Sequence, residues 1–78
     1  MPRRAANPDP AIETRAHPKS GRVYEIRAYR SGTYEIWLDG KVVRVIGYAR
    51  IDIHPYPSNR KQDEALRAAR VYVDTMLE

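Results

Sequence analysis

Hydrophobic and polar residues alternate along two stretches in the middle of the chain. Residues 24–28 (YEIRA) and 34–38 (YEIWL) place a hydrophobic side chain at every second position. A period of two is typical of a strand with one buried face and one exposed face. The pattern therefore predicts two strands of an antiparallel sheet.

The connections between strands determine which side chains lie opposite each other. A two-residue turn at Ser31-Gly32 mixes polar and apolar faces, whereas a three-residue loop with Gly32 in the left-handed position of a bulge pairs Ile26 with Ile36. The dipeptide Asp39-Gly40 is typical of a two-residue type I′ hairpin turn and aligns Ile36 with Val43. The sequence thus predicts a three-stranded antiparallel meander.

These registers assign the side chains to two faces. The predicted apolar face comprises Tyr24, Ile26, Ala28, Tyr34, Ile36, Leu38, Val43 and Val45. The predicted opposite face comprises Val23, Glu25, Arg27, Tyr29, Thr33, Glu35, Trp37, Val42, Arg44 and Ile46.

A change from strand to helix spacing follows the prolines at 55 and 57. Ser58 or Asn59 is a suitable N-cap, and hydrophobic residues then recur at helical spacing. The predicted apolar stripe comprises Leu66, Ala69, Val73 and Met76, widened by Ala65, Tyr72 and Leu77. We expect one C-terminal helix, about 59–77, to pack on the meander, giving an α+β domain over residues 22–78.

The remaining segments carry weaker patterns. Residues 1–21 contain four of the six prolines and few hydrophobic residues, which predicts a flexible N-terminal arm. Asp9 before Pro10 could begin a short helix over residues 11–16. Residues 51–54 alternate again and predict a short fourth strand, which either extends the meander or begins a second small sheet.

Composition excludes several classes of site. The 78-residue chain has no cysteine and two histidines, so it has no disulfide, no thiolate ligand and too few ligands for a zinc site. No metal or other cofactor is indicated. The absence of a long apolar run predicts a soluble cytoplasmic protein without membrane contact. Its formal net charge of +4 permits contact with nucleic acid but also serves solubility alone.

The face predicted to lie opposite the helix is the most informative candidate for binding. Its candidate binding residues are Arg27, Tyr29, Trp37, Val42 and Arg44. Half of the face is apolar or aromatic, which predicts a cover of some kind. That cover could be residues 48–57 or the N-terminal arm through Ile12, or a protein partner, including a second copy. Nucleic acid is the alternative partner: the aromatic rings would stack on bases and the arginines would contact phosphates. Glu25 and Glu35 oppose this binding because they reduce the positive field that attracts phosphate.

Catalysis has little support in the sequence. Asp52 and His54 share one side of the predicted strand 51–54, as a carboxylate and the imidazole that it orients would. However, the chain has neither a serine in a nucleophile elbow nor a glycine-rich loop. We therefore predict a non-enzymatic accessory protein.

Two segments, GTYEIWLDGKVV and SNRKQDEALRAARVYVD, carry a resemblance to other proteins. Their order of strand, Asp-Gly hairpin, strand and alanine-rich helix resembles short uncharacterised bacterial proteins, some of them prophage-encoded. The same order is similar to the arm-binding domains of phage integrases and to the second half of double-stranded RNA-binding domains. This resemblance implies a fold order alone, and no functional residue is carried over from it.

Overall fold

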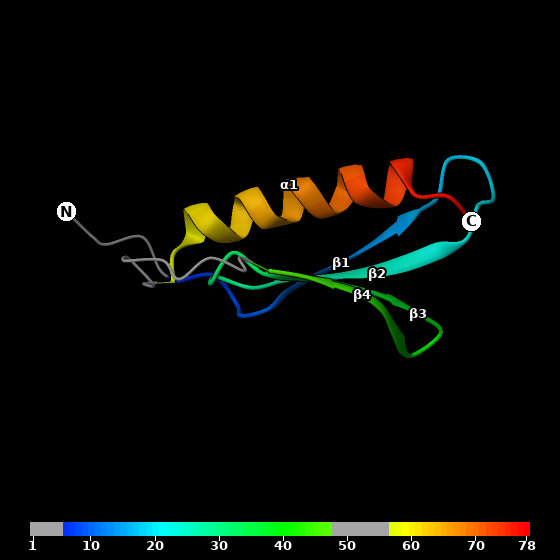
Figure 1. The fold of residues 1–78 in the computed structure, drawn as a ribbon. Helices are drawn as coiled ribbons and strands as arrows, with labels where there is room; N and C mark the ends of the chain where they lie inside the picture. The colour runs from blue at the N-terminus through cyan, green and yellow to red at the C-terminus, as the bar shows by residue number, and fades with distance from the viewer. Residues whose placement is uncertain (1–5, 48–56) are drawn as a thin grey trace.

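The fold is a four-stranded antiparallel sheet with one helix packed along one face (Figure 1). The computed structural model describes residues 6–47 and 57–78. The elements are β1 (Ala11–Ala16), β2 (Val23–Ala28), β3 (Tyr34–Leu38), β4 (Lys41–Ile46) and α1 (Asn59–Thr75), and the strand order is β1-β2-β3-β4. The predicted α+β class, with a meander packed by one C-terminal helix, is confirmed.

The two predicted turns set the register of the central strands. Gly32 has a φ of 96°, and Asp39 and Gly40 have φ values of 51° and 78°, so all three adopt the left-handed region that these turns require. Ile26 lies opposite Ile36, as predicted from the three-residue loop. The turn residues therefore fix the inner face of β2 and β3 from the sequence alone.

The helix predicted over residues 11–16 is wrong, because Ala11–Ala16 form strand β1. This strand pairs antiparallel with β2 along its whole length, with Ile12 opposite Arg27 and Thr14 opposite Glu25. The part of the predicted N-terminal arm from 11 to 16 is thus an edge strand of the domain. The helix-side positions of β1 include Glu13 and Arg15, so the buried side lacks the hydrophobic pattern by which strands are recognised.

Two ion pairs hold β1 to the helix. Arg15 donates to both oxygens of Asp74 at 2.8 Å, and Arg70 donates to the two oxygens of Glu13 at 2.7 and 2.6 Å. Each is a two-bond arginine–carboxylate pair, which is the geometry that gives both strength and orientation. These pairs give the charged inner row of β1 its partners.

The ion pairs predict a loss of stability in acid. The hydrogen bond from Arg70 lowers the pKa of Glu13, and the hydrogen bond from Arg15 lowers that of Asp74. A carboxyl whose pKa is lower in the folded state stabilises the fold above its unfolded pKa of about 4, and this contribution is lost as the pH falls through the folded pKa. Between pH 7 and pH 2, the free energy of unfolding in urea should therefore fall less in Glu13→Gln than in the wild type. Glu64→Gln is the control, since Glu64 forms an ion pair at 3.4 Å with Arg60, which is one helical turn away on the same helix and does not join two elements.

The core lies between α1 and the inner face of β2 and β3. Its buried hydrophobic residues are Tyr24, Ile26, Ala28, Tyr34, Ile36, Ala65, Ala69 and Val73. Leu38, Ile46, Leu66, Tyr72 and Met76 pack against this cluster while partly buried. Small alanines on the helix allow it to approach the sheet closely, so the core is filled mainly by isoleucine and tyrosine from the strands.

Helix α1 begins where the sequence predicts and ends earlier. The Ser58 side chain accepts a hydrogen bond from the Lys61 backbone N–H at 3.1 Å, as an N-cap does. The helix ends at Thr75, and Leu77, predicted to widen the apolar stripe, is 97% exposed. The predicted strand at 51–54 lies outside the described residues.

Strand β4 departs from the predicted register because it contains a bulge. Trp37 lies opposite Val42 as predicted, but Ile36 then lies opposite Arg44 instead of Val43. Val43 is the extra residue, and beyond it the side chains of β4 exchange faces. Val43 and Val45, predicted to be buried, are 46% and 57% exposed, whereas Ile46 packs against the core.

The helix explains why β4 tolerates this exchange. Its backbone lies along β1, β2 and β3 but does not reach β4 within the described residues. A side-chain contact, from the Arg44 guanidinium to the Tyr72 ring at 6.0 Å, spans the gap. Since α1 does not cover β4, burial beneath this helix does not impose on β4 the alternation of apolar and polar residues that it imposes on β2 and β3.

Candidate protein interface

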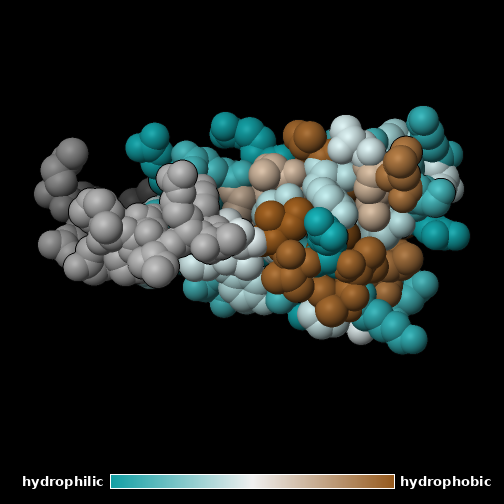
Figure 2. Space-filling model, viewed as in Figure 1, coloured by the Kyte–Doolittle hydropathy of each residue, from teal (hydrophilic) through white to brown (hydrophobic). Residues whose placement is uncertain are grey.

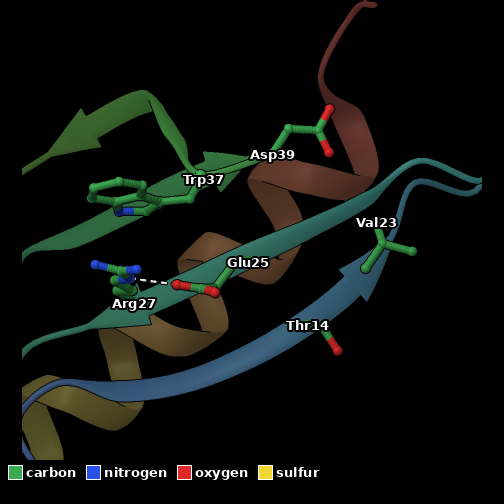
Figure 3. A pocket seen from close by; sticks show the side chains of 7 residues that line it. Thr14, Val23, Glu25, Arg27, Trp37 and Asp39 are labelled. Atoms are coloured by element: carbon green, nitrogen blue, oxygen red, sulfur yellow. Dashed lines mark hydrogen bonds and ion pairs between the residues drawn. The ribbon is translucent and has the colours of Figure 1, made fainter.

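The sheet surface opposite α1, which we call the Trp37 face, carries four of the five candidate binding residues. Trp37 lies opposite Glu25 on β2 and opposite Val42 on β4, and Arg27 lies on the same face as Trp37. Tyr29 follows β2 directly and reaches the same face through Glu35. Figure 3 looks onto this face, with α1 behind the sheet and the side chains of Arg27 and Trp37 next to each other.

Arg44 does not belong to this face. It lies opposite Ile36, whose side chain is in the core, and its guanidinium lies over Tyr72 on the helix side of the sheet. The bulge at Val43 is the reason, because one extra residue rotates every later side chain to the other face. The sequence-based assignment of Arg44 to the Trp37 face is therefore wrong.

Arg27 forms the centre of the face together with Trp37. The Arg27 guanidinium lies 4.0 Å from the Trp37 ring centroid, which is a cation–π contact. Its Nε also donates to the Glu25 carboxylate, shown dashed in Figure 3. Two partners thus hold the arginine over the indole, and the pair forms a preorganised surface of the residue types that anchor protein interfaces.

Glu35 connects Tyr29 and Trp37, the two aromatic residues identified on the face. It accepts hydrogen bonds from the Tyr29 hydroxyl at 2.8 Å and from the Trp37 indole N–H at 3.1 Å. The bond to Glu35, together with burial, raises the pKa of the Tyr29 hydroxyl, so this group remains a proton donor at neutral pH. Glu35 therefore pairs with the polar groups of both aromatic side chains.

Exposed aliphatic side chains lie around this polar centre. They are Ile12 at 61%, Val23 at 57%, Val42 at 48% and Val45 at 57% exposure. Sequence reasoning missed Ile12 as a strand residue and assigned Val45 to the core. Ile12, Thr14 and Ala16 alternate with Glu13 and Arg15, but the less polar residues are the exposed ones, so this pattern does not mark a strand by burial. Nothing in the sequence marks the bulge that turns Val45 outward.

A shallow pocket of about 200 Å³ lies beside Trp37 (Figure 3). It is lined by Thr14, Val23, Glu25, Arg27, Trp37, Asp39 and Gly40. This volume is below the range of about 300 to 1,000 Å³ that is usual for small-molecule sites. A pocket of this volume can accommodate one side chain of a partner. Its lining includes two carboxylates and one guanidinium, which favours a neutral or cationic side chain.

The described residues include a second polar cluster, at the buried ring of His17. Its Nε2 lies 2.9 Å from the Met76 carbonyl oxygen, and its Nδ1 accepts a hydrogen bond from the Lys19 backbone N–H at 3.1 Å. The Glu78 carboxylate lies 3.1 Å from the same Nδ1 and accepts a hydrogen bond from the Tyr24 hydroxyl at 2.6 Å. This cluster holds the chain after α1 against the β1–β2 loop.

Asp52 and His54, the weak candidates for acid–base chemistry, lie outside the described residues.

No group of acidic or histidine side chains in residues 6–47 and 57–78 is arranged to hold a metal ion. In the same residues, no helix has the length and hydrophobicity to cross a membrane. No family model, curated protein or solved structure matches this chain.

Proposed function

We propose that this chain is a small non-enzymatic accessory protein that acts as a protein-interaction module, with the Trp37 face as its docking surface. The observation that carries this proposal is the ring of exposed aliphatic residues around Trp37. Exposed apolar side chains gathered on one face about an aromatic residue and an arginine are typical of protein interfaces.

The pairing of the polar groups supports the same function. Covering a surface is unfavourable when it removes water from a charge that has no other partner. Here Arg27 keeps Glu25 and Trp37 as partners, and Glu35 keeps Tyr29 and Trp37. A partner can therefore cover the centre of the face without having to supply partners for these groups.

The charge of the face favours a protein over nucleic acid. Glu25, Glu35 and Asp39 are acidic, whereas Arg27 is the one basic residue among those identified on the face and in its pocket. A polyanion requires the opposite balance, since phosphate contacts come mainly from lysine and arginine. A nucleic-acid partner is therefore not favoured, and the crosslinking experiment distinguishes it from a protein partner.

Site-specific crosslinking tests the proposal with two matched positions. Val45 lies on the Trp37 face and Val71 on α1, and each is 57% exposed. We expect a photoreactive amino acid at position 45, in the cells that make this protein, to give a discrete protein adduct that is absent from position 71. An adduct with twice the mass of the chain identifies a second copy.

Three results would contradict the proposal. Equal adducts from positions 45 and 71 would show that the face is not distinguished from ordinary surface. A nuclease-sensitive adduct would replace the protein partner with nucleic acid. Weak quenching by acrylamide of the fluorescence of Trp37, the one tryptophan of the chain, in an isolated monomer would show that the chain covers its own face.

A further inference from the structure

The two edges of the sheet differ in how they are protected. On the helix side of β1, the Glu13 and Arg15 side chains are tied to α1 by ion pairs. Strand β4 pairs on one side only, with β3, within the described residues, and its side chains from Lys41 to Val45 are all exposed. Figure 2 shows a hydrophobic patch below the helix, on the side of the molecule where β4 lies in Figure 1. The β4 edge therefore offers both backbone hydrogen-bonding groups and apolar surface.

The bulge sorts the side chains of β4 into two rows. Val42 and Val45 lie opposite Trp37 and Glu35, so they form a row on the Trp37 face. Lys41 and Arg44 lie opposite Leu38 and Ile36, so they form a row on the helix side. An unbulged strand would place residues 41 and 44 on opposite faces, because side chains alternate. The extra residue, Val43, is thus what puts the two cations next to each other.

These cations have no acidic partner within the described residues. Lys41 forms no ion pair there, and Arg44 contacts the Tyr72 ring at 6.0 Å. The strand residues opposite them are two apart in β3, which places the cations roughly 6.5 Å apart along the strand. Carboxylates on alternate residues of a neighbouring strand would have the same spacing.

From these rows we infer that β4 binds an extended segment of another protein as a fifth strand, in which acidic residues alternate with apolar ones. The acidic residues lie beside Lys41 and Arg44, and the apolar residues lie beside Val42 and Val45. The backbone of the segment pairs with the edge of β4 that no strand in residues 6–47 and 57–78 occupies, as in other complexes formed by strand addition. This inference rests on the proposed function and names the partner's chemistry and mode of binding.

Charge argues against a second copy at this edge. Two β4 strands paired about a two-fold axis would bring two lysines and two arginines together beside the same strand pair. Like charges on neighbouring strands are destabilising. Lysine at an edge is also one of the means by which proteins prevent pairing between edges. Its positive charge opposes an identical edge but favours a strand whose charges are opposite.

Binding of short synthetic peptides tests this inference. We expect a labelled peptide that alternates glutamate with valine to bind the full chain, and a peptide with lysine in place of glutamate to bind at least about tenfold more weakly, by fluorescence anisotropy at low salt. A variant with Lys41→Glu and Arg44→Glu should reverse this preference. Because the variant must gain affinity for the lysine peptide, unfolding cannot imitate the expected result.

N-methylated peptides separate strand addition from attraction between side chains alone. Alternate amides of a strand point to opposite edges, so methyl groups on all glutamate amides or on all valine amides block different edges. We expect one methylated peptide to bind and the other to lose binding. Equal binding of both would overturn strand addition, and equal binding of the glutamate and lysine peptides would overturn the charge assignment.

The two proposals fail separately. If neither peptide binds while position 45 still gives its specific adduct, the Trp37 face is a docking surface but the β4 strand-addition inference is wrong. If the glutamate peptide binds as expected while positions 45 and 71 crosslink alike, the β4 edge binds an acidic strand but the Trp37 face has no specific partner. A dimer that is lost in the variant with Lys41→Glu and Arg44→Glu would assign the edge to a second copy and overturn the inference.

Discussion

Replacing Ile36 with alanine is expected to lower the free energy of unfolding by about 2 to 5 kcal/mol. Ile36 is fully buried and lies opposite Ile26, also fully buried, at the centre of the sheet beneath α1. Alanine at this position removes apolar contacts and leaves a cavity that the sheet backbone cannot close. Domains of this length have a total stability of roughly 4 to 12 kcal/mol, so this loss removes a substantial part of the free energy of unfolding.

Urea unfolding followed by circular dichroism measures this loss. Ile12→Ala provides the control, since it makes the same substitution on the same sheet at a side chain that is 61% exposed. We expect the free energy of unfolding of this control to fall by less than about 1 kcal/mol. Similar losses from the two variants would mean that α1 does not pack on the inner face of the sheet.

The second large effect is expected from Gln62→Glu, because Gln62 is the buried polar residue of the helix. Its Nε2 donates to the carbonyl oxygens of Pro8 at 2.7 Å and of Ala28 at 3.1 Å, and its side chain is 1% exposed. A carboxylate at this position has no hydrogen to donate and faces two carbonyl oxygens. We expect the free energy of unfolding to fall by about 3 kcal/mol or more at pH 7.

This loss should depend on pH in a defined direction. Burial beside two carbonyl oxygens raises the pKa of the new carboxyl in the folded state above its unfolded value of about 4.3. The folded state tolerates the neutral acid, so the free energy of unfolding of Gln62→Glu should differ least from that of the wild type below pH 4. This difference should grow as the pH rises from about 4.3 to the raised pKa of the folded state.

Gln62→Met is the matched control for charge. It also removes both hydrogen bonds, but it introduces no titratable group and removes the Gln62 Oε1, which has no hydrogen-bond partner. We expect a loss of about 1 to 3 kcal/mol that does not change with pH relative to wild type. A pH-dependent difference in this variant would contradict the assignment of the effect to the carboxylate.

Gln62 also shows how a residue that sequence patterns treat as polar surface takes a structural role. It lies at helical spacing before Ala65 and Ala69, yet its side chain tethers the segment before β1 to the end of β2. Asn59 acts similarly by accepting from the Asn7 backbone N–H at 2.9 Å. These contacts join residues more than thirty positions apart, so no local pattern predicts them.

The two edge strands were the least predictable elements, for one physical reason. Periodicity in a sequence reports burial, and the helix covers the inner face of β2 and β3 most completely. The inner row of β1 includes charged residues that pair with α1, and β4 lies beyond the backbone of α1. Neither strand is therefore required to show the apolar alternation by which it would be recognised.

By itself, the sequence determined the α+β class, both turns, the pairing of β2 with β3, the helix start and the placement of Trp37 opposite the core. Each follows from local chemistry. Gly32 and Gly40 adopt the left-handed φ that the turns require, and Ser58 is the N-cap of the helix. Hydrophobic residues recur at every second position in β2 and β3 and at helical spacing in α1. Only the tertiary structure decided the strand identity of residues 11–16 and the bulge at Val43. Both depend on where α1 lies across the sheet, since long-range ion pairs to α1 stabilise β1, whereas the backbone of α1 does not reach β4.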